Sequence, residues 1–204
     1  MNINYDPKEQ NKAIQARESF NGRLLTDSQF DEAMTITNII EREIRKTGAF
    51  KEKLGDYSYA FSRSEKFDAM KSEAIIRDLF KERCGQTMNQ MKEGLKINER
   101  NLTSNQKHEA LSHAQGVGKM IQDGNKISFH RAYAYQGQNL ADKHNITETH
   151  AKSLMREAFK ASDGKELYDW GKEQEKQFYT PQIEAEKQQR QNTQSQSHSP
   201  HRSR

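Results

Sequence analysis

Residues 26–48 read TDSQFDEAMTITNIIEREIRKTG and carry the signals of one long helix. Thr26 offers a side-chain oxygen to the amides of the first turn, and Gly48 can adopt the positive φ that commonly ends a helix. Between them, side chains suited to a core recur every three or four residues, which places them on one face. They are Phe30, Ala33, Met34, Thr37, Ile40 and Ile44. This stretch predicts a core-forming α-helix.

Helices of the same kind are expected on both sides of this stretch. Asp6 and Pro7 predict the start of an earlier helix that runs to about Gly22, because proline fits the first helical position. Polar pairs spaced three residues apart predict further helix starts by the capping-box rule. These pairs are Ser62 with Glu65, Thr87 with Gln90, and Thr103 with Gln106. Gly85 is expected to end the helix that begins at Ser62.

One segment departs from the helical pattern. Residues 53–63 place Tyr57, Tyr59 and Phe61 at alternate positions, which is the period of a strand. We expect a packed loop here, with a short strand as the alternative.

Three further helices are predicted toward the C-terminus. One runs from Ser128 to His144 with a possible break at Gly137, and a second spans residues 147–162. The last starts near Glu166, and Pro181 should mark its end or a kink, because proline clashes with the preceding turn. Asp123-Gly124-Asn125 is expected to form a turn.

Composition favours an all-α fold with a thin core. Only 32% of the residues are hydrophobic and 30% are charged, which suits slender amphipathic helices in an elongated or loosely packed domain. After Glu186 there is no apolar residue, so residues 187–204 are expected to be a disordered basic tail. The predicted organisation is a helical domain of about five amphipathic helices over residues 1–125, and a second helical unit over residues 126–186.

The positive charge is concentrated in this tail. Four of the 33 basic residues and none of the 29 acidic residues follow Glu186, so residues 1–186 hold 29 of each sign. The overall net charge of +4 is therefore no evidence of a basic surface on the body of the protein.

Other features point to a soluble protein of the bacterial cytoplasm. Cys84 is the single cysteine, so no intramolecular disulfide can form. No stretch approaches the roughly 18 consecutive apolar residues of a membrane span, and the N-terminal residues lack the apolar run of a signal peptide.

Residues 137–158, which read GQNLADKHNITETHAKSLMREA, match the pattern of two helices joined by a sharp turn. Ala141 is small enough for two helices to cross, and Asn145 tolerates the positive φ that such a turn needs. Ile146 is expected to be buried after the turn, and Thr147 to cap the second helix. The inner face of the pair would consist of Leu140, Ala151, Leu154 and Met155. The segment predicts a helix-turn-helix.

The outward face of the second helix is the candidate DNA-binding surface. Its side chains are of types that hydrogen-bond to base edges or phosphates in a major groove: Thr149, His150, Lys152, Ser153 and Arg156. Arg131 and Lys143 could contact the DNA backbone. Residues 126–160 hold six basic and three acidic residues, a local excess of +3, although Glu148 would repel phosphate.

This segment resembles the helix-turn-helix of bacterial regulators over about 22 residues. The mixture of this motif, Lys- and Gln-rich helices and an Arg-ending tail looks like accessory proteins of bacterial plasmids and conjugation systems. That resemblance implies a role at transfer-origin DNA, with other proteins of a transfer or secretion apparatus as further partners. It also implies that the protein could be translocated through a type IV channel, with the basic tail as the signal.

The main alternative is a helical adaptor or secreted effector that binds protein through its amphipathic helices, because paired helices of this kind also occur in proteins that never touch DNA. Trp170, Tyr168, Phe178 and Tyr179 could stack on bases, but their spacing favours packing of the last helix.

No pattern supports an enzyme, a metal site or a bound cofactor. His108 and His113 lie about 140° apart around a helix and cannot share one metal ion. The segment Gly116-Val117-Gly118-Lys119 lacks the spacing of a phosphate-binding loop and more closely fits a helix end. Cys84 lies at a helix C-terminus, where no helix dipole would activate its thiol.

Overall fold

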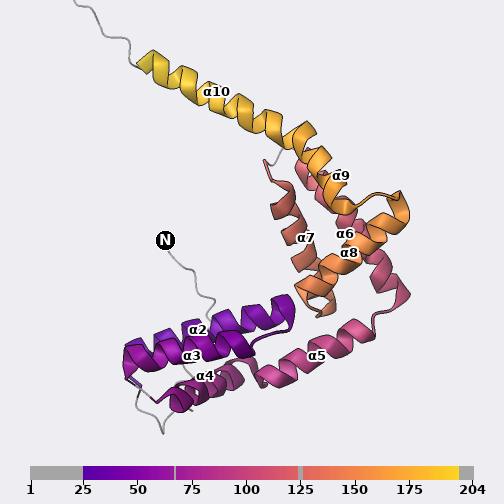
Figure 1. The fold of residues 1–204 in the computed structure, drawn as a ribbon. Helices are drawn as coiled ribbons and strands as arrows, with labels where there is room; N and C mark the ends of the chain where they lie inside the picture. The colour runs from indigo at the N-terminus through magenta and orange to yellow at the C-terminus, as the bar shows by residue number, and fades with distance from the viewer. Residues whose placement is uncertain (1–24, 67, 124–125, 198–204) are drawn as a thin grey trace, which may run out of the picture. The chain divides into compact units, whose positions relative to one another are not determined.

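The computed structural model describes residues 25–66, 68–123 and 126–197, and every regular element in these ranges is a helix (Figure 1). The predicted all-α class is confirmed for this part of the chain. The helix predicted from Asp6 to Gly22 lies outside the described residues. The chain divides into two compact units, Met1–Arg100 and Asn101–Arg204, each with its own hydrophobic cluster. The division comes before the boundary predicted after residue 125, because the helix of residues 104–122 packs with the second unit.

The first unit contains α2 (Asp27–Thr47), α3 (Lys51–Glu65), α4 (Ala69–Cys84) and α5 (Met88–Arg100). The start of α2 is the predicted one: the Thr26 side chain accepts from the Gln29 amide, and the Gln29 side chain accepts from the Thr26 amide. Gly48 ends α2 with a φ of 72°. The Thr87–Gln90 pair caps α5 in the same way.

The predicted loop at residues 53–63 is wrong, because these residues lie inside α3. The inward positions Leu54, Ser58 and Phe61 follow a helical period of three to four residues. A small polar residue occupies one of them, which hides the stripe in the sequence, whereas Tyr59 is exposed. The alternating aromatic residues therefore lie on different faces of one helix.

The predicted cap at Ser62 and Glu65 is also wrong. Ser62 lies within α3, and its hydroxyl donates to the Tyr59 carbonyl at 2.7 Å. The cap of α4 is Asp68, whose carboxylate accepts from the amides of Met70 and Lys71. The helix nevertheless ends at Gly85 as predicted, with a φ of 67°.

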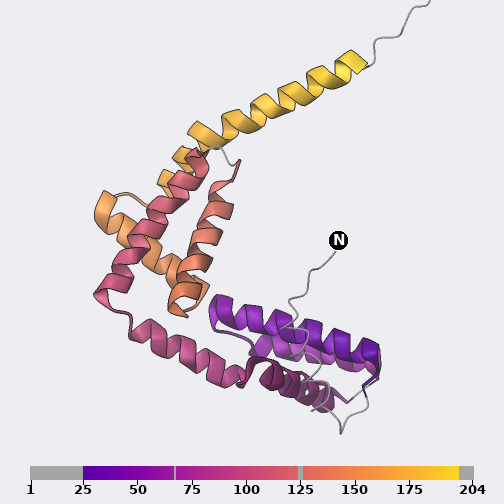
Figure 2. The same cartoon turned by 180° about the vertical axis from the view of Figure 1, so that it is seen from behind.

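The core of the first unit lies between α2, α3 and α4, which run side by side in both ribbon views (Figures 1 and 2). α5 packs on α2 and α4 and adds its apolar stripe to this core. The buried side chains are Phe30, Ala33, Ile36, Ile40, Ile44, Phe50, Leu54, Phe61, Ile75, Ile76, Leu79, Phe80, Met88, Met91 and Leu95.

The second unit contains α6 (Ser104–Gln122), α7 (Phe129–His144), α8 (Glu148–Asp163), α9 (Leu167–Gln174), the π-helix η1 (Glu175–Tyr179) and α10 (Thr180–Ser197). α6, α7 and α8 each pack against the other two, and α9 packs on all three. The close approach of α9 to α7 depends on a small residue, Gly171. A Cβ at Gly171 would lie 2.1 Å from Cδ2 of Phe129, so only glycine admits that ring.

Two predicted interruptions in this unit are not observed. α7 continues through Gly137 without a break. α10 continues through Pro181, because the chain first widens into η1, where the Thr180 amide donates to the Glu175 carbonyl five residues back. Proline then occupies the first turn of α10, where its missing amide hydrogen costs least.

The predicted disorder after Glu186 is not confirmed for residues 187–197, which continue α10 to Ser197 (Figure 2). The Gln, Lys and Arg residues of this segment have good intrinsic helix propensity, although they offer no apolar face to a core. Glu186 also forms ion pairs with Lys126 and Arg190. Residues 198–204 lie outside the described part of the chain.

Candidate nucleic-acid interface

A tight turn joins α7 to α8. Asn145 takes a left-handed conformation, with φ of 48° and ψ of 55°. The Ile146 amide donates to the Ala141 carbonyl at 3.0 Å, and the Asn145 amide donates to the Asp142 carbonyl at 3.4 Å. These two bonds are those of a Schellman motif, which satisfies carbonyls that a helix end leaves unpaired. The three residues predicted for the turn therefore adopt the conformation expected of them, with Ile146 buried and Thr147 accepting from the His150 amide.

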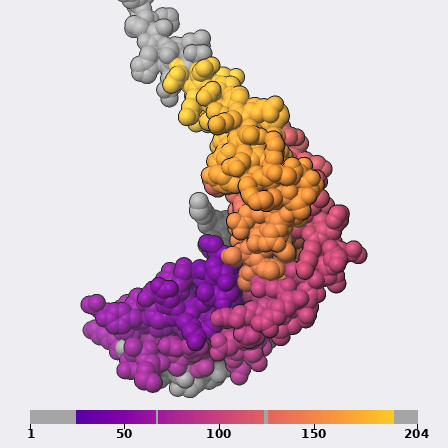
Figure 3. Space-filling model, turned by 45° about the vertical axis from the view of Figure 1, so that its right-hand side comes forward, coloured from indigo at the N-terminus to yellow at the C-terminus, as the bar shows by residue number. Residues whose placement is uncertain are grey.

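The turn directs one face of α8 into the core of the second unit. Ala151, Met155 and Phe159 are buried at steps of four residues and meet α6 and α7. Leu154, predicted to line the same face, is partly buried against the cluster. Thr149 and Arg156 are exposed, and the space-filling view shows part of the uncovered surface of this region in orange (Figure 3).

Lys152 is less available for contact with DNA than the sequence predicts. Its side chain lies across α7, where a Cβ at Gly137 would be 2.7 Å from its Cγ. Its ammonium donates to Oε2 of Glu148 at 3.2 Å, and only 24% of its side chain is exposed. Tyr133 of α7 donates its hydroxyl proton to the Lys152 carbonyl at 2.9 Å. Lys152 therefore serves mainly to fasten α8 to α7.

The remaining predicted contacts differ in their availability. Lys143 forms an ion pair with Oε2 of Glu109 at 2.8 Å. Ser153 donates to Glu157 at 2.9 Å, and His150 is partly buried. Arg131 and Arg156 are exposed and form no ion pair within the described residues. Arg156 lies near enough to Tyr133 to act on its pKa, which burial nevertheless raises above the ordinary value.

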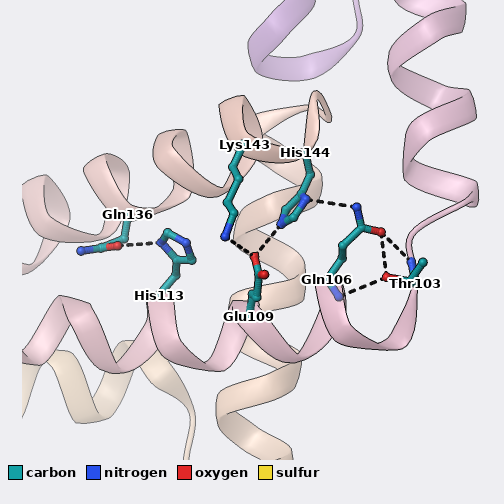
Figure 4. A network of polar contacts seen from close by, with 7 residues as sticks. All are labelled: Thr103, Gln106, Glu109, His113, Gln136, Lys143 and His144. Carbon is teal, nitrogen blue, oxygen red and sulfur yellow. Dashed lines mark hydrogen bonds and ion pairs between the residues drawn. The ribbon is translucent and has the colours of Figure 1, made fainter.

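A polar seam holds α6 against α7 (Figure 4). The Thr103 amide donates to Oε1 of Gln106 at 2.8 Å, which fixes the orientation of the Gln106 side-chain amide. The NH₂ group of Gln106 then faces Nδ1 of His144 at 3.3 Å, so this nitrogen must accept. Nε2 of His144 consequently carries the proton and donates to Glu109 at 2.9 Å. The capping box of α6 thereby fixes the tautomer of a histidine on α7.

The seam continues one turn further along α6. Nδ1 of His113 donates to Oε1 of Gln136 at 2.8 Å, and the Gln136 amide nitrogen points toward the sulfur of Met120 at 3.3 Å. Lys143 and His144 lower the pKa of Glu109 by hydrogen bonding to its carboxylate. Among the described residues, no three His, Cys, Asp or Glu side chains are grouped as metal ligands would be.

Sequence reasoning missed one residue that positions α7. The Glu175 carboxylate accepts from the Phe129 amide at 3.3 Å and from the Lys172 ammonium at 2.6 Å. It occupies the N-terminus of α7 in place of Ser128, whose side chain makes no capping bond. No local pattern relates Glu175 to Phe129, because they are 46 positions apart.

Two other sequence features have structural roles. Residues 116–119 lie inside α6, which continues to Gln122 instead of ending there as predicted. Burial raises the pKa of the Cys84 thiol to about 11, so this side chain is protonated at neutral pH.

None of the described helices is both long and apolar enough to cross a membrane.

Comparison with known proteins supplies no relative. No family model, curated protein or solved structure matches the chain.

Proposed function

We propose that this protein binds duplex DNA, with α7, the turn at Asn145–Thr147 and α8 acting as a helix-turn-helix. The observation that carries the proposal is the division of α8 into two faces. Ala151, Met155 and Phe159 are buried against α6 and α7, whereas Thr149 and Arg156 point away from the core. A recognition helix needs such an arrangement, because its inner face must be held rigidly while its outer face enters the major groove.

The contacts are proposed to be unequal. Arg156 and Thr149 reach into the groove, since both are exposed. Arg131 of α7 contacts a phosphate, and His150 and Ser153 lie at the margin of the contact. Lys152 and Lys143 contribute only when DNA replaces the carboxylates of Glu148 and Glu109, which now hold them. We infer from the resemblance described above that the biological setting is a plasmid or conjugative element.

The test is a fluorescence-anisotropy titration of the full chain with plasmid-derived duplex DNA at low and at moderate salt. Arg156→Ala should weaken binding about tenfold and lower the slope of log K against log salt by about one, as for one lost phosphate or base contact. Arg63→Ala, an exposed arginine of the first unit, is the matched control and should leave both unchanged. A flat isotherm for the wild-type chain at low salt would end the proposal.

A second candidate function rests on the charge of α8. Its 16 residues include three basic and three acidic side chains, and two of the basic ones form ion pairs with Glu148 and Glu166. Phosphate recognition favours an excess of cations, so a neutral outer face suits a protein partner better. We infer that, if DNA binding fails, the protein acts as a helical adaptor or a type IV-secreted effector. Deleting residues 187–204 should then abolish transfer into recipient cells, and unchanged transfer would count against a C-terminal signal.

A further inference from the structure

The aromatic residues near the C-terminal end of the second unit fall into two groups. Trp170 lies against Phe159 with ring centroids 4.8 Å apart, and Phe178 and Tyr179 are packed against the same core. These three follow the expectation that they pack the last helix. Tyr168 does not, because 52% of it is exposed. Core packing therefore does not explain why an aromatic residue occupies position 168.

The surroundings of Tyr168 hold its ring in a fixed position. It meets the buried ring of Phe129 edge-on, with centroids 5.5 Å apart and an interplanar angle of 85°. The exposed ring of His130 lies 5.9 Å away. The Lys172 ammonium is 6.0 Å from the centroids of both Phe129 and Tyr168, and the ion pair with Glu175 fixes it there. An exposed ring that is already ordered loses little conformational entropy when it binds a ligand.

We propose that the surface formed by His130, Tyr168 and Lys172, on α7 and α9, binds an unpaired base of single-stranded nucleic acid. Two exposed rings provide π faces for a base. The counter-charge for the attached phosphate comes from Arg131, which follows His130 directly and forms no ion pair in the described ranges. Lys172 adds to it only where the phosphate replaces the Glu175 carboxylate, which now holds its ammonium. Bases within a duplex are stacked on one another and cannot use such a surface.

This inference goes beyond the proposed duplex binding and does not depend on it. The duplex surface is centred on α8 and shares only Arg131 with this one, whose rings belong to the first turn of α7 and to α9. The carboxylates of an acidic peptide would also be attracted by Arg131, but a carboxylate has no π face to stack on Tyr168. A requirement for bases therefore separates the two kinds of partner.

The experiment is an anisotropy titration of the full chain with a fluorescein-labelled oligo(dT) of about 12 nucleotides, within the usual range of single-strand site sizes. Tyr168→Ala and Tyr168→Leu should each weaken binding about tenfold, the size expected for the loss of one base stack, and Tyr168→Phe should retain wild-type affinity. Tyr168→Leu keeps an apolar side chain against Phe129, so weaker oligo(dT) binding by this variant cannot be attributed to a damaged core. Tyr59→Ala is the control, because Tyr59 is 59% exposed and has the Arg63 guanidinium 6.0 Å from its ring centroid.

A second arm replaces the oligonucleotide by an abasic strand with the same number of phosphates. The wild-type chain should bind the abasic strand less tightly than oligo(dT), and Tyr168→Leu should bind both alike. Equal wild-type affinity for the two strands, no binding of oligo(dT), or competition by poly-glutamate as strong as by oligo(dT) would overturn the inference. Arg156→Ala should change duplex binding alone and Tyr168→Leu single-strand binding alone, so the two proposals can fail separately.

Discussion

The two units build their cores from different side chains. The first unit buries one alanine among large aliphatic and aromatic residues, whereas the second buries five alanines. The described glycines of the two units differ in the same way. A Cβ at Gly55 or Gly94 of the first unit would meet nothing within 4 Å, but at Gly118 and Gly171 it would lie 2.2 Å and 2.1 Å from aromatic ring atoms.

Each unit therefore fixes its helices in its own way. Interdigitated large side chains hold the first unit together, so its stability should be most sensitive to substitutions that shorten a buried side chain. In the second unit, rings pack directly on helix backbones, so its stability should be most sensitive to substitutions that enlarge a small buried residue. The second unit also contains the surfaces to which we assign binding, which require well-positioned helices.

The largest effect is expected from Leu79→Ala in the first unit. Leu79 is fully buried, and the cavity left by its side chain should lower the free energy of unfolding by about 2–5 kcal/mol. Urea titration followed by far-UV circular dichroism measures this loss. The fluorescence of Trp170, the single tryptophan, reports the second unit in the same titration. A Trp170 transition that shifts equally would contradict two separate cores.

Gly171→Ala in the second unit should have the next largest effect. The new methyl group must displace the Phe129 ring, so we expect a loss of about 1–3 kcal/mol, the usual cost of overpacking. The loss should appear in the Trp170 fluorescence transition. Unchanged stability would mean that α7 and α9 can separate without cost and that the close contact is unimportant.

Gly94→Ala in the first unit should act in the opposite direction. Gly94 lies inside α5 with open space around its Cα, so alanine adds helix propensity without a clash and should stabilise by about 0.5–1 kcal/mol. A rise in the thermal midpoint, measured by circular dichroism, checks this expectation. A fall would show that glycine is needed in α5 for a contact outside the described residues.

The smallest effect is expected from Glu109→Gln in the polar seam. The pKa of Glu109 is lowered in the folded protein, so ionised Glu109 contributes stability above the ordinary pKa of 4.5, and that contribution is lost as the pH falls through the lowered value. Glu109→Gln should therefore be slightly less stable than wild type at neutral pH, and the difference should shrink in acid. Thermal melts at pH 7 and pH 3 compare the two, and a difference that grows in acid would contradict this assignment.

Much of the helical framework could be predicted from local signals. Capping pairs and terminal glycines act within a few residues, so the limits of α2 and the starts of α5 and α6 were legible in the sequence. α3 was missed because a buried serine interrupts its apolar stripe. The cap of α4 was misplaced because Ser62 and Asp68 are both suitable caps, and only packing decides between them.

The candidate interface was predictable to the same extent. The conformations of Asn145, Ile146 and Thr147 follow from their own chemistry, and they agree with the structure. Which cations are free to contact DNA could not be predicted from the sequence. Lys143 pairs with a carboxylate contributed by another helix, and Lys152 lies on a glycine of α7. Those contacts depend on which helices become neighbours, and no short pattern records that.

The carboxylate at the start of α7 restricts how a nucleic acid could approach this helix. Free amides at a helix N-terminus attract phosphate through their positive potential. Here the Phe129 amide already donates to Glu175, which places a negative charge where a phosphodiester would otherwise sit. A nucleic-acid strand that passes this end of α7 would be repelled by the Glu175 carboxylate and attracted by the guanidinium of Arg131. The positive potential of the helix N-terminus is thus masked, and the Arg131 side chain supplies the positive charge instead.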